Sequence, residues 1–104
     1  MLMSTSDSIA GREISQTLGV VTANAVRARH VGRDVLAGLK TLVGGEIGAY
    51  RDLMTESRDQ AIERLRTEAE AMGADALVSV RMTTSSIMQG ASEVLIYGTA
   101  VRLR

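Results

Sequence analysis

The sequence predicts an α+β protein, a small antiparallel sheet in β-α-α-β-β order with helices packed on one face. Two observations predict this class: three stretches alternate between apolar and polar residues, and two others repeat apolar residues at helical spacing. Both helical stretches lie between the first and second alternating stretches. The 104 residues suit one domain, which we take to be residues 1–104.

The first predicted strand covers residues 13–22, where Ile14, Leu18 and Val20 alternate onto one face and Val21 onto the other. Gly19 interrupts this strand and indicates a β-bulge or a close backbone approach. We interpret residues 23–30 as a connector.

Two helices are expected next. In residues 31–43 apolar side chains recur at 31, 35, 39 and 42. Residues 49–72 form the clearer helix, and Gly73 is in the position that usually ends one. On its outer face, Arg64 with Glu68 and Arg66 with Glu70 have the spacing of ion pairs. Its inner face is predicted to carry Tyr50, Met54, Ser57, Ala61, Leu65, Ala69 and Met72.

The chain closes with two more predicted strands. Residues 74–84 form the second, with Val78, Val80 and Met82 on one face, and residues 85–92 form a hairpin loop. In the third, one face carries Leu95, Tyr97, Val101 and Leu103, and the other Val94, Ile96 and Ala100. Because the helices cover one side only, we expect another copy of the chain to cover Val94 and Ile96.

Composition excludes several classes of function. Lys and Arg number 12, as do Asp and Glu, so the zero net charge offers no basic field for nucleic acid or an anionic membrane. With 0 Cys, disulfides and thiolate metal sites are excluded. The first residues resemble no secretory signal, and no apolar run approaches the ~20 residues of a membrane span. We therefore expect a cytoplasmic protein.

Gly44 and Gly45 interrupt the helical pattern. A phosphate-binding loop, a hinge or a corner between two helices would each use such glycines. The segment "GGEIG" lacks the Lys-Ser/Thr of a Walker loop, so a corner is favoured, with Tyr50 near the start of the long helix. If a ligand pocket exists, we expect it near Arg33, Asp34, Gly44, Gly45 and Tyr50.

His30 is the only histidine, and Asp34 follows one helical turn later. This pair is the candidate metal site, although a closed zinc site needs about four ligands, which a symmetric ring would have to gather. The alternative is a polar helix start, with Asp34 stabilising the first turn.

Catalysis is not indicated. The chain has no recognisable nucleophile and acid–base set, and the carboxylates of the long helix alternate with arginines as on a solvated face. Arg33, Arg51 and Arg58 would suit an anion site, but scattered arginines are more often surface charges. We predict neither an enzyme nor a cofactor.

Four stretches, "GVVTANAV", "RDVLAGLKTLVGGEIGAY", "MGADALVSV" and "YGTAVR", resemble the YbjQ-like family. The resemblance implies a small α+β protomer that assembles into a ring-shaped homopentamer. It also implies binding of heavy metals, which the absence of cysteine argues against. The family's recurring polar positions match Thr22, Arg33, Asp34, Tyr50 and Asp75. We expect a non-enzymatic, self-assembling protein that binds a small ligand or ion between copies; the alternative is a metal-binding module whose sites are gathered by symmetry.

Overall fold

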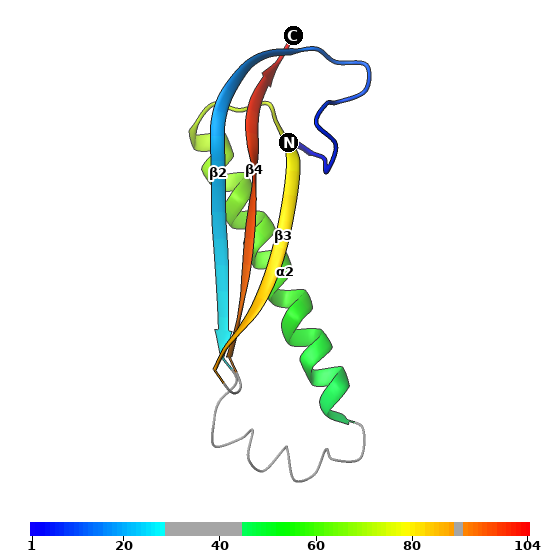
Figure 1. The fold of residues 1–104 in the computed structure, drawn as a ribbon, viewed down its shortest axis with the longest axis vertical. Coiled ribbons are helices and arrows are strands. Elements are labelled where there is room, and N and C mark those ends of the chain that lie inside the picture. Colours follow the sequence, from blue (N-terminus) through cyan, green and yellow to red (C-terminus); the bar gives the residue numbers. More distant parts are fainter. Residues whose placement is uncertain (29–44, 89–90) are drawn as a thin grey trace.

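The computed structural model describes residues 1–28, 45–88 and 91–104. Its elements are β1 (Leu2–Met3), β2 (Ile14–Ala28), α2 (Gly45–Ala71), β3 (Ala76–Met88) and β4 (Ala91–Leu103). The strands form a sheet in the order β1-β3-β4-β2, and α2 crosses one face diagonally (Figure 1). The α+β class is confirmed. The helix predicted at residues 31–43 lies outside the described residues.

The sheet is mixed rather than antiparallel. β2 and β3 both pair antiparallel with β4; the sequence predicted the β3–β4 hairpin, but neither the pairing of β2 with β4 nor the observed strand order. The short strand β1, which was not predicted, pairs parallel with β3 through Leu2 with Ala76 and Met3 with Leu77. Two residues are too few for an alternating pattern to be recognised in the sequence.

Strand β2 runs six residues beyond the predicted end at residue 22, so the connector predicted at residues 23–30 is wrong over its first part. Ala23 and Ala25 pair opposite the apolar Ile96 and Val94 of β4. This pairing keeps the segment of small residues in the sheet although its own β-propensity is low. The bulge predicted at Gly19 is confirmed by a register shift between Thr17 and Gly19 and by a φ of 136°.

The bulge at Gly19 reverses which side chains face the core. Leu18 and Val21 both pack in the main core, whereas Val20 is exposed. The predicted common face of Leu18 and Val20 is therefore wrong, because the extra residue shifts the alternation by one.

Helix α2 buries most of the predicted face, with Ser57, Ala61, Leu65 and Ala69 fully buried. Met72 is instead exposed beyond the helix end, where the amides of Gly73 and Ala74 bond to the carbonyls of Glu70 and Ala69. These two bonds form a Schellman cap, and Gly73 has the required positive φ of 80°. The helix begins at Gly45 rather than at residue 49.

The predicted ion pairs of α2 are replaced by other contacts. Arg66 pairs with Glu63, and Arg64 donates from Nη1 to the backbone carbonyl of Asn24 at 2.7 Å. Arg64 therefore connects the helix to β2 instead of bonding along the helix.

A second bulge lies in β3, between Val78 and Arg81, where Ser79 has a φ of 53°. It places Val78 on the opposite side of the sheet from Val80, so the predicted common face of Val78, Val80 and Met82 is wrong. β3 also extends to Met88 and β4 begins at Ala91, so most of the predicted hairpin loop is strand.

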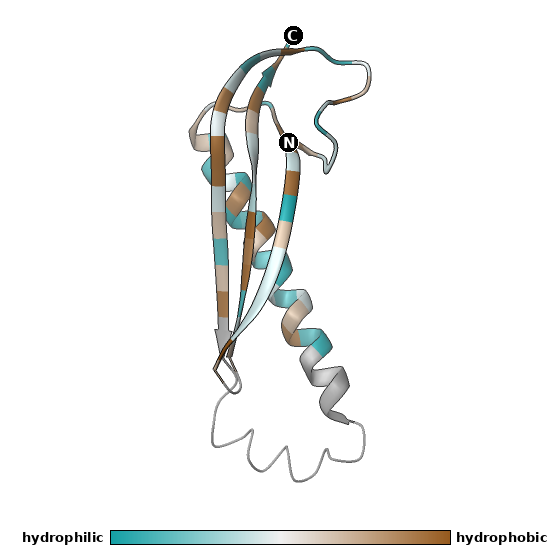
Figure 2. Ribbon diagram, viewed as in Figure 1, coloured by the Kyte–Doolittle hydropathy of each residue, from teal (hydrophilic) through white to brown (hydrophobic). Residues whose placement is uncertain are grey.

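The main core lies between the sheet and α2, and Figure 2 shows the apolar bands of the strands that contribute to it. Val94 and Ile96 are 0% and 1% exposed there, in one cluster with Ala61 and Leu65 of α2. The expectation that another copy covers Val94 and Ile96 is therefore wrong, because the chain's own helix covers them. A smaller cluster lies on the other side and comprises Ala76, Val78 and Val101, with Ile9, Ile14 and Leu103 packed against it.

Candidate functional site

The sheet face opposite α2 carries exposed apolar side chains. Side chains alternate along a strand, so Leu95 and Tyr97 of β4 point away from the helix that covers Val94 and Ile96. Tyr97 is 40% exposed on this face, and Val20 and Val26 of β2, which pair with Thr99 and Glu93, are 73% and 52% exposed. We name Val20, Val26, Leu95 and Tyr97 the open face.

The open face begins where the small second cluster ends. Near the termini, Ile9 and Ile14 pack against Val78 and Val101 and so protect that part of the face. Farther along the sheet, Thr22 lies opposite Tyr97 on β2 and Arg81 lies opposite it on β3, and all three are exposed. Among the described residues, the open face therefore has no covering element.

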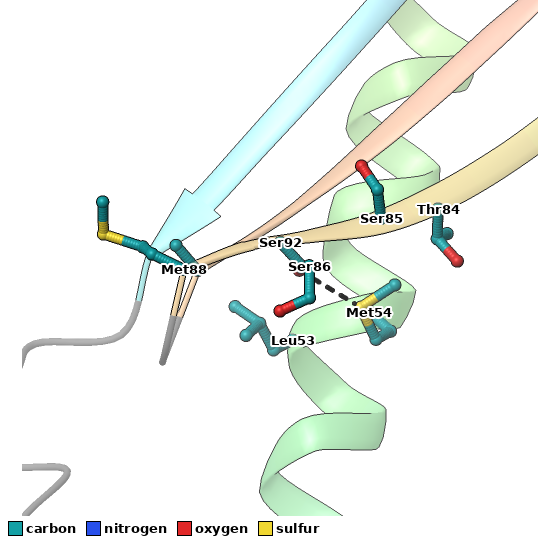
Figure 3. A pocket seen from close by; sticks show the side chains of 8 residues that line it. Leu53, Met54, Thr84, Ser85, Ser86, Met88 and Ser92 are labelled. Carbon is teal, nitrogen blue, oxygen red and sulfur yellow. Dashed lines mark hydrogen bonds between the residues drawn. The ribbon is translucent and has the colours of Figure 1, made fainter.

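A cavity of about 240 Å³ lies between α2 and the strands near the β3–β4 hairpin. Figure 3 shows Met54 directed toward Ser92, whose hydroxyl donates to the Met54 sulfur at 3.4 Å. Thr84 and Ser86 add hydroxyl groups to the lining, and Leu53 adds an apolar wall. Among the described residues, the lining offers hydroxyl and thioether groups for binding and no titratable side chain.

Sequence reasoning missed this cavity because Met54 was assigned to the core and residues 85–92 to a loop. The β-branched residues Thr83, Thr84 and Ile87 in "TTSSIM" were the available signal that the strand continues.

A polar groove of about 510 Å³ follows the outer side of β2. Thr22 and Asn24 line it from the strand, and Glu63, Arg64 and Glu68 line it from α2. Arg64 spans the groove through its bond to the Asn24 carbonyl. The groove therefore combines both signs of charge with backbone groups at the edge of the sheet.

Most of the predicted site residues cannot be placed. His30, Arg33, Asp34 and Gly44 lie outside the described residues, so the candidate metal pair and the ligand pocket stay predictions. Gly45 and Tyr50 lie in the first turns of α2. Within the described ranges, no group of three or more His, Cys, Asp or Glu side chains is arranged to hold a metal ion.

Two other predictions concern single positions. Arg51 and Arg58 are exposed on α2, as surface charges would be. Asp75 lies in the turn after the helix, and its Oδ2 accepts a hydrogen bond of 2.9 Å from the Leu103 amide.

Within residues 1–28, 45–88 and 91–104, no helix has the length and apolarity needed to cross a membrane.

Known proteins resemble this chain along its whole length. A UPF0145 protein of Photobacterium profundum is 57% identical over 103 residues, covering 99% of this chain and 100% of that protein. One of Halorubrum lacusprofundi is 57% identical over 104 residues and covers 100% of both chains. A crystal structure of a Pediococcus pentosaceus protein of unknown function, assigned to the DUF74 family, has the same fold. Its TM-score is 0.66 at 19% identity, with 100% of this chain and 98% of that one covered. A family model described as "Putative heavy-metal-binding" matches residues 1–104, and the chain therefore belongs to this family, YbjQ.

Proposed function

We propose that this chain is a non-enzymatic cytoplasmic protein that assembles with copies of itself, in a ring of five as the resemblance implies. The observation that carries the proposal is the open face, where Val20, Val26 and Tyr97 are exposed, whereas α2 buries Val94 and Ile96 on the other side of the sheet. Exposed apolar side chains on an uncovered sheet face, here separated by the polar Thr22 and Asn24 of β2, support an interaction surface. The partner is a second copy, with neither nucleic acid nor membrane involved.

The gain from covering the open face is estimated from its exposed side chains. Complete burial of a valine contributes roughly 1.5–3 kcal/mol. Since Val20 is 73% exposed, covering it contributes about 1–2 kcal/mol per copy. A change of 1.4 kcal/mol alters a dissociation constant about tenfold. A single charged substitution at Val20 is therefore expected to weaken assembly measurably.

Light scattering coupled to size exclusion tests the proposal with Val20→Glu. The matched control is Thr55→Glu, which places the same charge at an exposed position of α2. We expect Val20→Glu to raise the dissociation constant more than tenfold, and the control to assemble like the unmodified chain. If Val20→Glu assembles normally, the open face is not the interface.

Binding of a small ligand or ion between copies is the finer part of the proposal. We propose the ligand pocket near Arg33, Asp34, Gly44, Gly45 and Tyr50, as the sequence predicts. Phosphate, as a probe for an anion, is expected to bind the assembled protein more weakly in Arg33→Ala and Tyr50→Ala. Unchanged binding in both variants would remove this pocket from the proposal.

Metal binding is the second candidate function. The description of the family supports it, as does the Met54 thioether that faces a hydroxyl-lined cavity, because thioether ligands select soft ions such as Cu(I). His30 and Asp34, gathered from several copies, are the alternative ligands.

Metal analysis of tag-free protein loaded with Cu(I) or Zn²⁺ separates the two ligand sets. Met54→Leu is expected to lower Cu(I) loading, whereas His30→Ala is expected to lower Zn²⁺ loading. Less than one ion per assembly with either metal would contradict metal binding.

A further inference from the structure

The cavity beside the β3–β4 hairpin lies where the packing between α2 and the sheet ends. Ser57 is fully buried, whereas Leu53 and Met54, one turn nearer the start of the helix, are half-buried. On the sheet, the small residues Ala91 and Ser92 at the start of β4 line the cavity. Because such small side chains do not fill the space beneath the helix, a cavity of about 240 Å³ remains.

Three hydroxyl groups line the sheet side of this cavity. Thr84 pairs with Val94, and Ser86 pairs with Ser92. Residues directly opposite each other on neighbouring strands share a face, and α2 covers the face that carries Val94. The side chains of Thr84, Ser86 and Ser92 therefore all lie on the helix side of the sheet.

The hydroxyl of Ser92 has a weak partner. It donates to the sulfur of Met54 at 3.4 Å, and a thioether accepts hydrogen bonds less well than a carbonyl oxygen does. A ligand carbonyl in the cavity therefore gives Ser92 a better acceptor. Thr84 and Ser86 are exposed, so water satisfies their hydroxyl groups until a ligand displaces it.

The lining favours an uncharged ligand. Leu53, Met54 and Ala91 are apolar, and Figure 3 shows Ser85 and Met88 directed away from Met54. An ionised ligand would lose hydration without an opposite charge in the lining to compensate. The apolar side chains instead suit a short hydrocarbon chain.

The volume limits the size of the ligand. At ~30 Å³ for each water molecule, the cavity of about 240 Å³ corresponds to about eight waters. A ligand of about eight non-hydrogen atoms therefore fills it. This is the size of a short-chain amide, ester or ketone.

We propose that this cavity binds a small uncharged carbonyl compound, whose short hydrocarbon chain packs against Leu53 and Met54 and whose oxygen accepts a hydrogen bond from Ser92. The hydroxyl of Ser92 turns from the Met54 sulfur to the ligand, and Met54 serves as an apolar wall. The site is separate from the pocket proposed near Tyr50, and it does not depend on self-assembly. Cu(I) held by the thioether is the competing occupant, which the experiment distinguishes.

Hexanamide is the probe, and hexanoate is its matched control because the two have nearly the same shape and differ in charge. Nuclear magnetic resonance of the full chain with labelled methionine methyl groups locates binding. The Met54 signal is expected to shift and saturate at millimolar hexanamide, since ligands of this size bind weakly. The signal of Met72, which is exposed beyond the helix, should stay in place. Hexanoate is expected to bind about tenfold more weakly or not at all.

Substitutions at the cavity test the assigned contacts, with saturation transfer to the hexanamide chain as the readout. Ser92→Ala is expected to weaken binding about two- to tenfold, as the loss of one hydrogen bond does. The control Thr83→Ala removes a hydroxyl on the opposite face of β3, beside Leu95, and should bind like the unmodified chain. Ser92→Leu fills the cavity and should abolish binding. Met54→Leu should keep it, unlike Cu(I) loading.

The remaining outcomes overturn the proposal or leave it standing alone. A Met54 signal that does not move, equal binding of hexanoate, or unchanged binding in Ser92→Ala each overturns it. If circular dichroism finds Ser92→Leu unfolded, Ser92→Ala and the two probes decide. Light scattering measures self-assembly separately, so a monomer that binds hexanamide overturns assembly and supports this site.

Discussion

Replacing Gly98 of β4 by alanine is predicted to destabilise the protein, because Gly98 lies opposite the bulge of β3. A Cβ atom at this position would lie 3.1 Å from Cγ2 of Val80 and 3.2 Å from the carbonyl oxygen of Val78. The carbonyl belongs to the backbone of a bulged strand that is paired on both sides of the bulge, so it has little freedom to move. Gly98→Ala is therefore expected to strain β3 where its alternation changes face.

The magnitude follows from two opposing effects. Overpacking by one methyl group in a packed region costs roughly 1–3 kcal/mol. Replacing glycine by alanine restricts the unfolded chain, which offsets about 0.4–1 kcal/mol of this. The net loss in the free energy of unfolding is about 1–2 kcal/mol. For a domain of this size, each kcal/mol lowers the midpoint of thermal unfolding by about 4–8 °C.

Urea unfolding followed by circular dichroism measures this loss, at one fixed protein concentration because assembly also affects stability. The double variant Gly98→Ala with Val80→Ala supplies the control for the steric cause. Removing Cγ2 of Val80 relieves the nearer contact, so the double variant should lose less stability than the sum of the single variants. A Gly98→Ala protein as stable as the unmodified chain would refute the steric argument.

Three further substitutions test the protomer by the same unfolding measurement. Leu65→Ala removes a fully buried side chain and is expected to cost about 2–5 kcal/mol, whereas the exposed Asp59→Ala should change stability by less than about 0.5 kcal/mol. Asp75→Ala breaks the 2.9 Å bond to the Leu103 amide and should cost about 1 kcal/mol; if Asp75→Asn, which keeps an acceptor, costs the same, the bond is not the cause. Gly73→Ala places a side chain at a φ of 80° and should cost about 1–2 kcal/mol, and a stabilised variant would contradict its role in the cap.

The sequence best predicts which side chains are buried where the spacing of the apolar residues continues along an element without a bulge. The stripe through Ser57, Ala61, Leu65 and Ala69 faces the core as predicted, because a continuous helix keeps its 3.6-residue period. The bulge at Gly19 was expected from the glycine. The bulge at Ser79 was not, because a serine with positive φ has no distinctive sequence pattern, and it reverses the faces of the residues on its two sides.

The alternation of side chains along β4 does not predict which face of this strand packs against α2. Both of its faces are apolar, so the pattern separates Val94 and Ile96 from Leu95 and Tyr97 but does not identify the side that α2 covers. That choice depends on the packing of a helix from another part of the chain. The uncovered apolar side was consequently assigned to the wrong face of the sheet.

Sedimentation of the unmodified, tag-free chain over a range of micromolar concentrations tests the central claim most directly. The account predicts one closed species at an integral multiple of the protomer mass, which dissociates on dilution without first unfolding. A folded species that keeps the mass of one protomer at every concentration, with Val20 and Tyr97 in contact with water, would contradict it.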